Sequence, residues 1–180
     1  LHAALKKCGG VRPIAIGNLL RRLTSKCFSF ATADRSAARL APHQLGVGVR
    51  GGLEAIVHTV RQLLQEGDED LVVLQVDLIN AYNRVDRDTA FREVEQHFPD
   101  CLKWVLSSYG VEAELVLGEN IILSRAGFHQ GDPLAGLLFS LVLQPIIDKI
   151  QSEIPSLKFN GWYLDDGCLV GRKEDLRKAV

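Results

Sequence analysis

Methionine is absent from this 180-residue chain, and the chain carries almost no net charge. With 21 Lys and Arg against 22 Asp and Glu, the formal charge is −1, so no overall basic field marks a nucleic-acid binder. Lys and Arg nevertheless outnumber the acids over residues 1–61. Because the chain opens on Leu1 and lacks Met, we expect a piece of a longer protein.

Long apolar runs are also missing. The longest, 135–147, is interrupted by polar residues and a proline and is too short to cross a bilayer, so no membrane partner is expected. No signal peptide is visible. The apolar content of 47% still suffices for one compact domain with a sizeable core.

Cysteine is scarce and scattered. No two cysteines form a Cys-x-x-Cys pair, and none has a nearby His at zinc-binding spacing, which argues against a disulfide framework or a zinc knuckle. We expect buried thiols in a reducing compartment. The four are Cys8, Cys27, Cys101 and Cys168.

The N-terminal part predicts a basic hairpin followed by helices. Segments 1–7 and 11–16 flank a Gly-Gly turn, and a helix is expected from Asn18, as N-cap, to about Leu40. The glycine-rich stretch 44–52 leads into a helix over 53–65. Since it lacks the Gly-Lys-Ser/Thr ending of a P-loop, we favour a flexible connector close to a ligand, with a phosphate loop as the alternative.

Segment 71–77 is almost continuously apolar and ends in Asp77, which predicts a buried strand with a carboxylate at its end. A turn is expected at 80–83, and Asp86 or Asp88 is expected to cap the next helix. Further elements are predicted as helices at 88–97 and 102–109 and strands at 112–117 and 121–125.

The loop 127–134 feeds directly into a strongly apolar helix over about 134–151, which must be central to the core. Asp132 suits the helix cap and Pro133 suits the first turn. The helix is therefore expected to position the loop rigidly.

Two short strands, 159–164 and 168–170, predict a hairpin near the end of the chain, with Asp165 and Asp166 in its turn. One interpretation is that Asp-Asp-Gly simply makes a good turn. The other is a catalytic carboxylate pair at the tip.

Metal-assisted phosphoryl transfer needs carboxylates from separate elements to converge on divalent cations. Asp77 would face Asp165 and Asp166 if the strand and the hairpin are neighbours in one sheet. Taken alone, Asp77 is more typical of a solvated acid at a strand end, and the neighbouring Asn-Ala-Tyr at 80–82 weakens that interpretation.

Four stretches in this order resemble the fingers and palm motifs of reverse transcriptases. They are Arg-Pro-Ile at 12–14, Val-Asp-Leu-Ile-Asn-Ala-Tyr-Asn at 76–83, Gly-Phe-His-Gln-Gly-Asp-Pro-Leu at 127–134 and Tyr-Leu-Asp-Asp at 163–166. Each motif is weak alone, and their order makes chance implausible. The Gln-Gly-Asp-Pro-Leu loop before an apolar helix resembles the non-LTR (LINE-like) retrotransposon enzymes; retroviral and group II intron enzymes usually carry Ser-Pro after the Gln-Gly.

The resemblance implies an RNA-directed DNA polymerase with two Mg²⁺ ions, for which Mn²⁺ is a possible substitute. Asp77 and Asp165 would bind the ions, with the backbone carbonyl of Leu78 assisting and Asp166 in support. Catalysis would then be mainly positioning and electrostatic stabilisation.

The resemblance also implies a dNTP site, an RNA template and a DNA primer. Tyr82 matches a steric gate that excludes a ribose 2′-hydroxyl, although it is also typical of a plain core aromatic. The residues implied at the nucleotide are Arg12, Lys6, Lys7, Tyr82, Gln130 and Gly131. Those implied at the template or primer are Gln44, Gly46 and Tyr163.

The fold class expected is α+β. The resemblance implies a right-hand polymerase palm, in which helices back an antiparallel sheet, together with partial fingers. The fingers are expected over about 1–70 and the palm over about 71–180. The thumb and any endonuclease domain would lie outside these residues. One alternative is a catalytically silent, domesticated palm that serves as a nucleic-acid or protein scaffold. Another is an RNA polymerase of the same architecture, against which Tyr82 argues.

Overall fold

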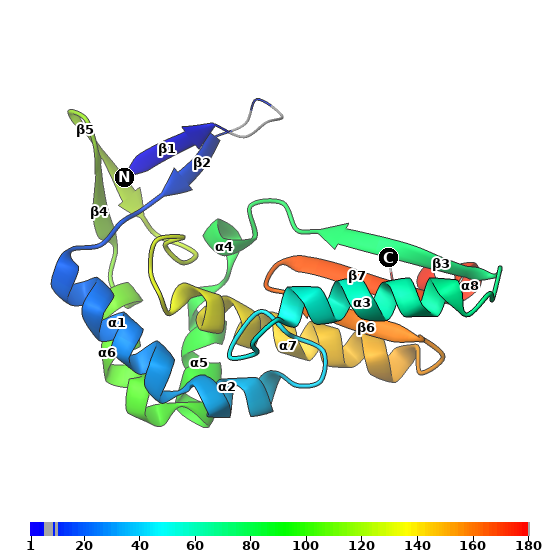
Figure 1. Ribbon diagram of the computed structural model, residues 1–180. Coiled ribbons are helices and arrows are strands. Elements are labelled where there is room, and N and C mark those ends of the chain that lie inside the picture. The colour runs from blue at the N-terminus through cyan, green and yellow to red at the C-terminus, as the bar shows by residue number, and fades with distance from the viewer. Residues whose placement is uncertain (6–8, 10, 180) are drawn as a thin grey trace. The chain divides into compact units, whose positions relative to one another are not determined.

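The computed structural model describes residues 1–5, 9 and 11–179 (Figure 1). Its helices and antiparallel strands give the mixed α+β class predicted from the sequence. The residues divide into two compact units, each made of two separate segments: Leu1–Thr32 with Asn80–Val142, and Ala33–Ile79 with Leu143–Val180. The division into fingers and palm at about residue 70 stays a prediction.

The first unit combines helices with two small hairpins. β1 (His2–Leu5) pairs antiparallel with β2 (Val11–Ile14), and β4 (Ala113–Leu117) with β5 (Asn120–Ser124), which confirms both predicted hairpins. Its helices are α1 (Leu19–Ala31), α4 (Ala81–Arg84), α5 (Arg87–His97), α6 (Pro99–Tyr109) and the first part of α7 (Ala135–Glu153).

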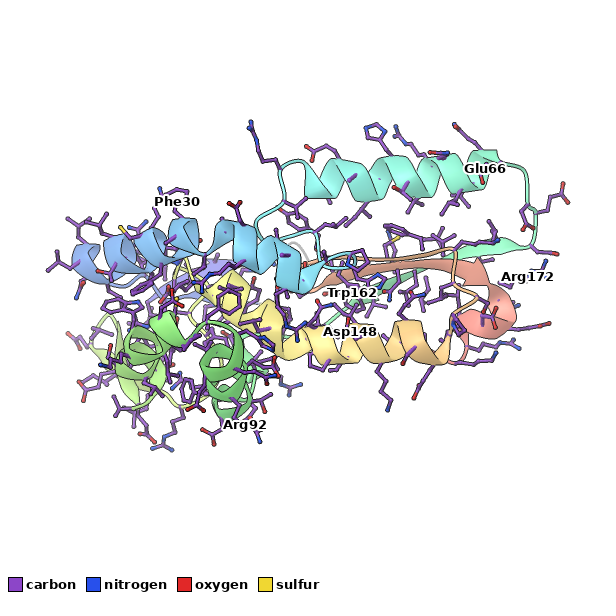
Figure 2. All side chains as sticks on the ribbon, turned by 90° about the horizontal axis from the view of Figure 1, so that it is seen from below. Phe30, Glu66, Arg92, Asp148, Trp162 and Arg172 are labelled. Carbon is purple, nitrogen blue, oxygen red and sulfur yellow. The ribbon has the colours of Figure 1, made fainter. Side chains whose placement is uncertain are left out.

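The second unit is built on a three-stranded antiparallel sheet in the order β3-β7-β6. Helix α3 and the C-terminal part of α7 lie on opposite faces of this sheet (Figures 1 and 2). A buried apolar cluster that includes Leu157 and Leu169 forms the core of this unit. Its other elements are α2 (Ala33–Leu40), α3 (Gly52–Gln65), β3 (Leu71–Asp77), β6 (Phe159–Tyr163), β7 (Asp166–Arg172) and α8 (Lys173–Leu176).

The single helix predicted over 18–40 is interrupted at Thr32, so that prediction is wrong in its middle. The N-cap is confirmed, because the side chain of Asn18 accepts a hydrogen bond from the N–H of Arg21 at 2.8 Å. Thr32 ends α1: its hydroxyl donates to the carbonyl of Phe28 at 2.8 Å, and its N–H donates to the same carbonyl at 3.0 Å. A short hydroxyl side chain competes with regular helix bonding in this way.

The apolar stripe of α1 lies on its exposed side. Leu19 is 77% exposed and Phe30 71%, and Figure 2 shows Phe30 on the outer side of the helix. The buried side is polar instead: Ser25 is fully buried, and its hydroxyl accepts a 3.1 Å hydrogen bond from the indole N–H of Trp104. The helical spacing of α1 is therefore right, and its apolar face does not contribute to the core of the described residues.

The cysteines only partly match the expectation of buried thiols. Cys101 is buried and Cys168 is half-buried, whereas Cys27 on α1 is exposed. Cys8 lies outside the described residues. The expectation is wrong for Cys27 because that helix turns its polar side inward.

Strand β3 is an edge strand in the described sheet, which corrects the prediction of a fully buried strand. Its one neighbour is β7, and Val72 and Val73 are 39% and 37% exposed. A continuous apolar run is typical of strands flanked on both edges and covered on both faces. Here the apolar residues serve contacts with helices rather than with a second neighbouring strand.

Helix α7 begins at Ala135, one residue after the predicted start. The carboxylate of Asp132 accepts a 3.0 Å hydrogen bond from the N–H of Leu134, so Asp132 lies just before the helix rather than at its cap, and Pro133 precedes the first turn. The first residues of α7 belong to the first unit and the rest to the second. No helix in the part of the chain that the structure describes has the length and apolarity needed to cross a membrane.

The packing of Trp162 against Gly167 predicts that a side chain added at position 167 destabilises the protein. A Cβ added at Gly167 would lie 2.7 Å from the Trp162 ring, which is buried and held by a 2.8 Å bond from its Nε1 to Asn160 Oδ1. We expect Gly167→Ala to lower the free energy of unfolding by roughly 1–3 kcal/mol, measured by chemical denaturation. Gly171→Ala on the same strand is the control, because its nearest neighbour is the flexible tip of Leu157 at 3.0 Å; equal losses for both variants would contradict the prediction.

Candidate active site

Asp77 and Asp166, two of the predicted carboxylates, lie opposite each other at one end of the sheet of the second unit. In the β3–β7 register Asp77 is directly opposite Asp166, and in the β6–β7 register Tyr163 is opposite Asp166. Directly opposed residues of antiparallel strands carry their side chains on the same face, with Cβ atoms about 5 Å apart. The strand and the hairpin are therefore neighbours in one sheet, as the sequence analysis requires.

The turn of the hairpin differs from the prediction. It consists of Leu164 and Asp165, whereas Asp166 is already the first residue of β7 and Gly167 is its second. Gly167 is needed in the strand because the ring of Trp162 occupies the space of a Cβ. Leu164 instead takes the left-handed conformation, with φ +57°, which costs a residue with a branched side chain about 1–2 kcal/mol.

A groove opens over the face of the sheet that carries these carboxylates. It encloses about 480 Å³ between α3 and the strands. Apolar side chains of α3, such as Ile56 and Val60, line one wall, and Asp77, Tyr163 and Asp166 line the sheet side. Asp77 and Asp166 are exposed and Asp165 is half-buried, so all three carboxylates are accessible to a ligand.

The oxygen donors at this sheet end suit a hard divalent cation. They are three carboxylates and the carbonyl of Leu78, which directly follows β3. Among the described residues, however, no group of three or more His, Cys, Asp or Glu side chains is gathered so as to hold a metal ion. Metal ligation by Asp77, Leu78, Asp165 and Asp166 therefore stays a prediction, supported by donor chemistry and strand register.

Gln44 is attached to the turn of the hairpin rather than exposed. Its side chain is 0% exposed, and its Oε1 accepts hydrogen bonds from the N–H of Leu164 at 2.8 Å and of Gly46 at 3.0 Å. Its Nε2 donates to the carbonyl of Leu164 at 3.0 Å. Gly46 also lies against the turn, since an added Cβ would be 2.6 Å from the backbone nitrogen of Leu164. The sequence carries no signal of these internal contacts.

In the first unit, the loop 127–134 is seated tightly against neighbouring backbone. The N–H of Phe128 donates to the carbonyl of Tyr82 at 2.7 Å. Gly127, at φ +65°, lies so close to this segment that an added Cβ would be 2.3 Å from the same carbonyl. A Cβ at Gly131 would be 2.5 Å from the carbonyl of Ala15. The glycines are thus required by close backbone approach.

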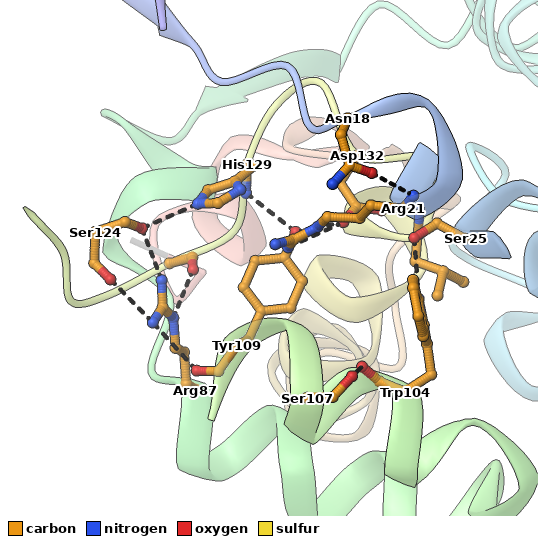
Figure 3. A network of polar contacts seen from close by, with 12 residues as sticks. Asn18, Arg21, Ser25, Arg87, Trp104, Ser107, Tyr109, Ser124, His129 and Asp132 are labelled. Atoms are coloured by element: carbon orange, nitrogen blue, oxygen red, sulfur yellow. Dashed lines mark hydrogen bonds and ion pairs between the residues drawn. The ribbon is translucent and has the colours of Figure 1, made fainter. Parts of the chain in front are cut away.

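A polar network holds the same loop from the side (Figure 3). The hydroxyl of Tyr109 donates to Asp132 at 2.9 Å, and Arg21 forms an ion pair with Asp132 at 3.4 Å. Burial, and then the Asp132 carboxylate, raise the pKa of Tyr109, so it remains a donor. The buried Arg87 donates to the carbonyl of Gly127 at 2.9 Å. Tyr109 and Arg87 belong to no motif noticed in the sequence, and only contacts in space reveal their role.

His129 of this loop is kept neutral. Its Nε2 lies 3.1 Å from the hydroxyl of Ser124. Burial, followed by the positive charges of Arg21 and Arg87, lowers the pKa of His129 to about 4. The ring is therefore an uncharged packing and hydrogen-bonding group at neutral pH.

The other predicted residues that the structure describes lie in the first unit. Arg12 is exposed on β2, and Gln130 is half-buried in the loop. The ring of Tyr82 stacks on Phe139 of α7, with centroids 4.8 Å apart and an interplanar angle of 16°. Lys6 and Lys7 lie outside the described residues.

Neutral His129 predicts a pH effect on stability. Because its pKa is near 6.5 when unfolded and about 4 when folded, the unfolded chain binds an extra proton between these values. The free energy of unfolding should therefore fall as the pH is lowered from 6.5 towards 4, by on the order of 1–3 kcal/mol. His129→Gln should flatten this slope in denaturation curves taken at several pH values, and His58→Gln, at an exposed position, should not. An unchanged slope in His129→Gln would refute the effect.

Comparison with known proteins bears on the family. Curated protein sequences give no match. Among solved structures, apo telomerase from Candida tropicalis, truncated from its C-terminal domain, is similar with a TM-score of 0.61 at 13% identity, over 94% of this chain and 43% of that chain. At this identity the likeness shows the fold alone, and this chain spans less than half of that one. The sequence profile described as "Reverse transcriptase (RNA-dependent DNA polymerase)" matches residues 4–180. The chain belongs to the reverse transcriptase family.

Proposed function

We propose that this chain carries the catalytic centre of an RNA-directed DNA polymerase, which extends a DNA primer with dNTPs on an RNA template. The observation that carries the proposal is the register that sets Asp77 opposite Asp166, with Asp165 in the adjoining turn. Membership in the reverse transcriptase family supports it.

Asp77, Asp165 and the carbonyl of Leu78 would hold two Mg²⁺ ions, or Mn²⁺ in their place, with Asp166 beside them. Such ions lower the pKa of the primer 3′-hydroxyl and neutralise the charge of the triphosphate. The contribution of the chain is to fix carboxylates on one strand end and one hairpin. Since opposed carboxylates repel each other, a cation would also relieve the repulsion between Asp77 and Asp166.

Arg12, Lys6 or Lys7, Gln130 and Gly131 are the proposed nucleotide contacts. Arg12 on the exposed side of β2, with Lys6 or Lys7, would bind the triphosphate. Gln130 and Gly131 would contact the nucleotide or template from a loop whose backbone is fixed by its glycines. In the second unit, Tyr163 would lie near the primer end, and Gly46 near the template.

We further propose that the enzyme belongs to a non-LTR retrotransposon-like element. The support is the Gln-Gly-Asp-Pro-Leu sequence at 130–134, just before α7, in which Asp132 accepts a hydrogen bond from Tyr109 and forms an ion pair with Arg21. Such an element would add a thumb and, where it carries one, an endonuclease domain.

Loss of one carboxylate tests the site. Asp165→Asn keeps the shape of the side chain and removes its charge, so primer extension on an RNA template should fall roughly 10²-fold to 10⁴-fold. Asp70→Asn, just before the opposite end of β3, is the matched control and should retain activity. Unchanged activity of Asp165→Asn would overturn the assignment, and an inactive native protein would favour a silent scaffold.

Tyr82 predicts sugar selectivity. If its ring excludes the 2′-hydroxyl, Tyr82→Val should increase incorporation of rNTPs relative to dNTPs by about tenfold or more, the equivalent of ~1.4 kcal/mol. Tyr82→Phe retains the ring and its stacking on Phe139, so it should keep the native ratio. Single-nucleotide incorporation assays measure the rNTP-to-dNTP ratio of each variant. An unchanged ratio in Tyr82→Val would mean that Tyr82 serves only in packing.

A further inference from the structure

The backbone of Leu164 has an unusual set of partners for a residue in a hairpin turn. Both its N–H and its carbonyl are bonded by one side chain, that of Gln44, at 2.8 and 3.0 Å. Leu164 also has a φ of +57°, a conformation that glycine adopts freely and leucine does not. The amide thus binds the one turn residue whose backbone conformation needs support.

The chemistry of these bonds demands an amide. The Oε1 atom accepts from two backbone N–H groups, those of Leu164 and Gly46, while Nε2 donates to the carbonyl of Leu164. A carboxylate has no donor, an ammonium has no acceptor, and an apolar side chain has neither. The side chain is also fully buried, so its amide is not shared with solvent.

The backbone around Gln44 is itself fixed to strand β6. The N–H of Leu45 donates to the carbonyl of Trp162 at 2.7 Å, and the N–H of Trp162 donates to the carbonyl of His43 at 2.7 Å. These bonds form a short parallel bridge between Gln44 and Trp162. Two residues after Trp162 the chain reaches Leu164, so the amide is held at a fixed distance from the turn.

We propose that Gln44 is a positioning residue: its side-chain amide holds Leu164 in the left-handed conformation and thereby fixes where Asp165 is presented. The inference rests on the proposed function of Asp165. It replaces the template contact expected for Gln44 from the sequence, because a buried amide with three internal hydrogen bonds is not presented to a template.

A kinetic test separates a role of Gln44 in positioning the turn from a role in binding the template. Gln44→Met keeps approximately the same volume and removes the amide. In primer extension by the full-length protein it should lower kcat roughly 10-fold to 100-fold and leave the Kd for the RNA template unchanged. Gln144→Met is the matched control, since Gln144 is also buried, at 1% exposure, and bonds Asp148 instead of the turn. A weakened template affinity with native kcat would overturn the proposal.

A second substitution tests the backbone mechanism. In a Leu164→Gly background the left-handed conformation needs no external support. Adding Gln44→Met there should cost at least about threefold less in kcat than it does in the native background. Equal losses in both backgrounds would mean that Gln44 acts on something other than Leu164.

Hydrogen exchange supplies a readout that does not depend on catalysis. In the native protein the amide of Leu164 should exchange at least about tenfold more slowly than that of its turn neighbour Asp165, and Gln44→Met should abolish the difference. An unprotected Leu164 amide in the native protein would overturn the proposal whatever the activity. Protection without any polymerase activity would instead leave the positioning intact and refute the proposed function of Asp165.

Discussion

The register between β3 and β7 is the constraint on which the candidate site depends. It places Asp77 opposite Asp166, and a slip by one residue would turn every side chain of β3 to the other face of the sheet. The apolar residues Leu74 and Val76 pack against the buried cluster and so hold the register. The same alternation that buries them leaves Asp77 on the groove side. The same strand register is therefore needed both to pack the core and to place the carboxylates.

Much of this arrangement could be predicted from local sequence signals. The cap at Asn18, the two small hairpins and the strand ending in Asp77 follow from turn chemistry and apolar spacing. These signals are short-range, so they indicate which elements form. That Asp77 faces the hairpin was only a conditional expectation from the sequence, and the pairing of β3 with β7 meets the condition.

Most of the wrong predictions have the same physical cause: the feature depends on contacts between residues that are far apart in the sequence. The break at Thr32 is local, because the Thr32 hydroxyl bonds the carbonyl of Phe28. The exposed stripe of α1 and the edge position of β3 depend instead on what each element packs against. Gly167 stands in the strand rather than in the turn, where the ring of Trp162 on the paired strand leaves no room for a Cβ. Likewise the amide of Gln44 and the network of Arg87 and Tyr109 join residues far apart in sequence. Local pattern carries no information on such pairs.

The interleaving of the two units has a consequence for the order of folding during synthesis. All segments of the first unit have been made once residue 142 has emerged, whereas β3 must wait for β7, its one neighbour in the described sheet. Until then, Val72 and Val73 belong to an unpaired strand, the kind of segment that nascent chains leave prone to aggregation. A ribosome that stalls before residue 166 would therefore release a chain in which β3 has no partner strand from the described sheet.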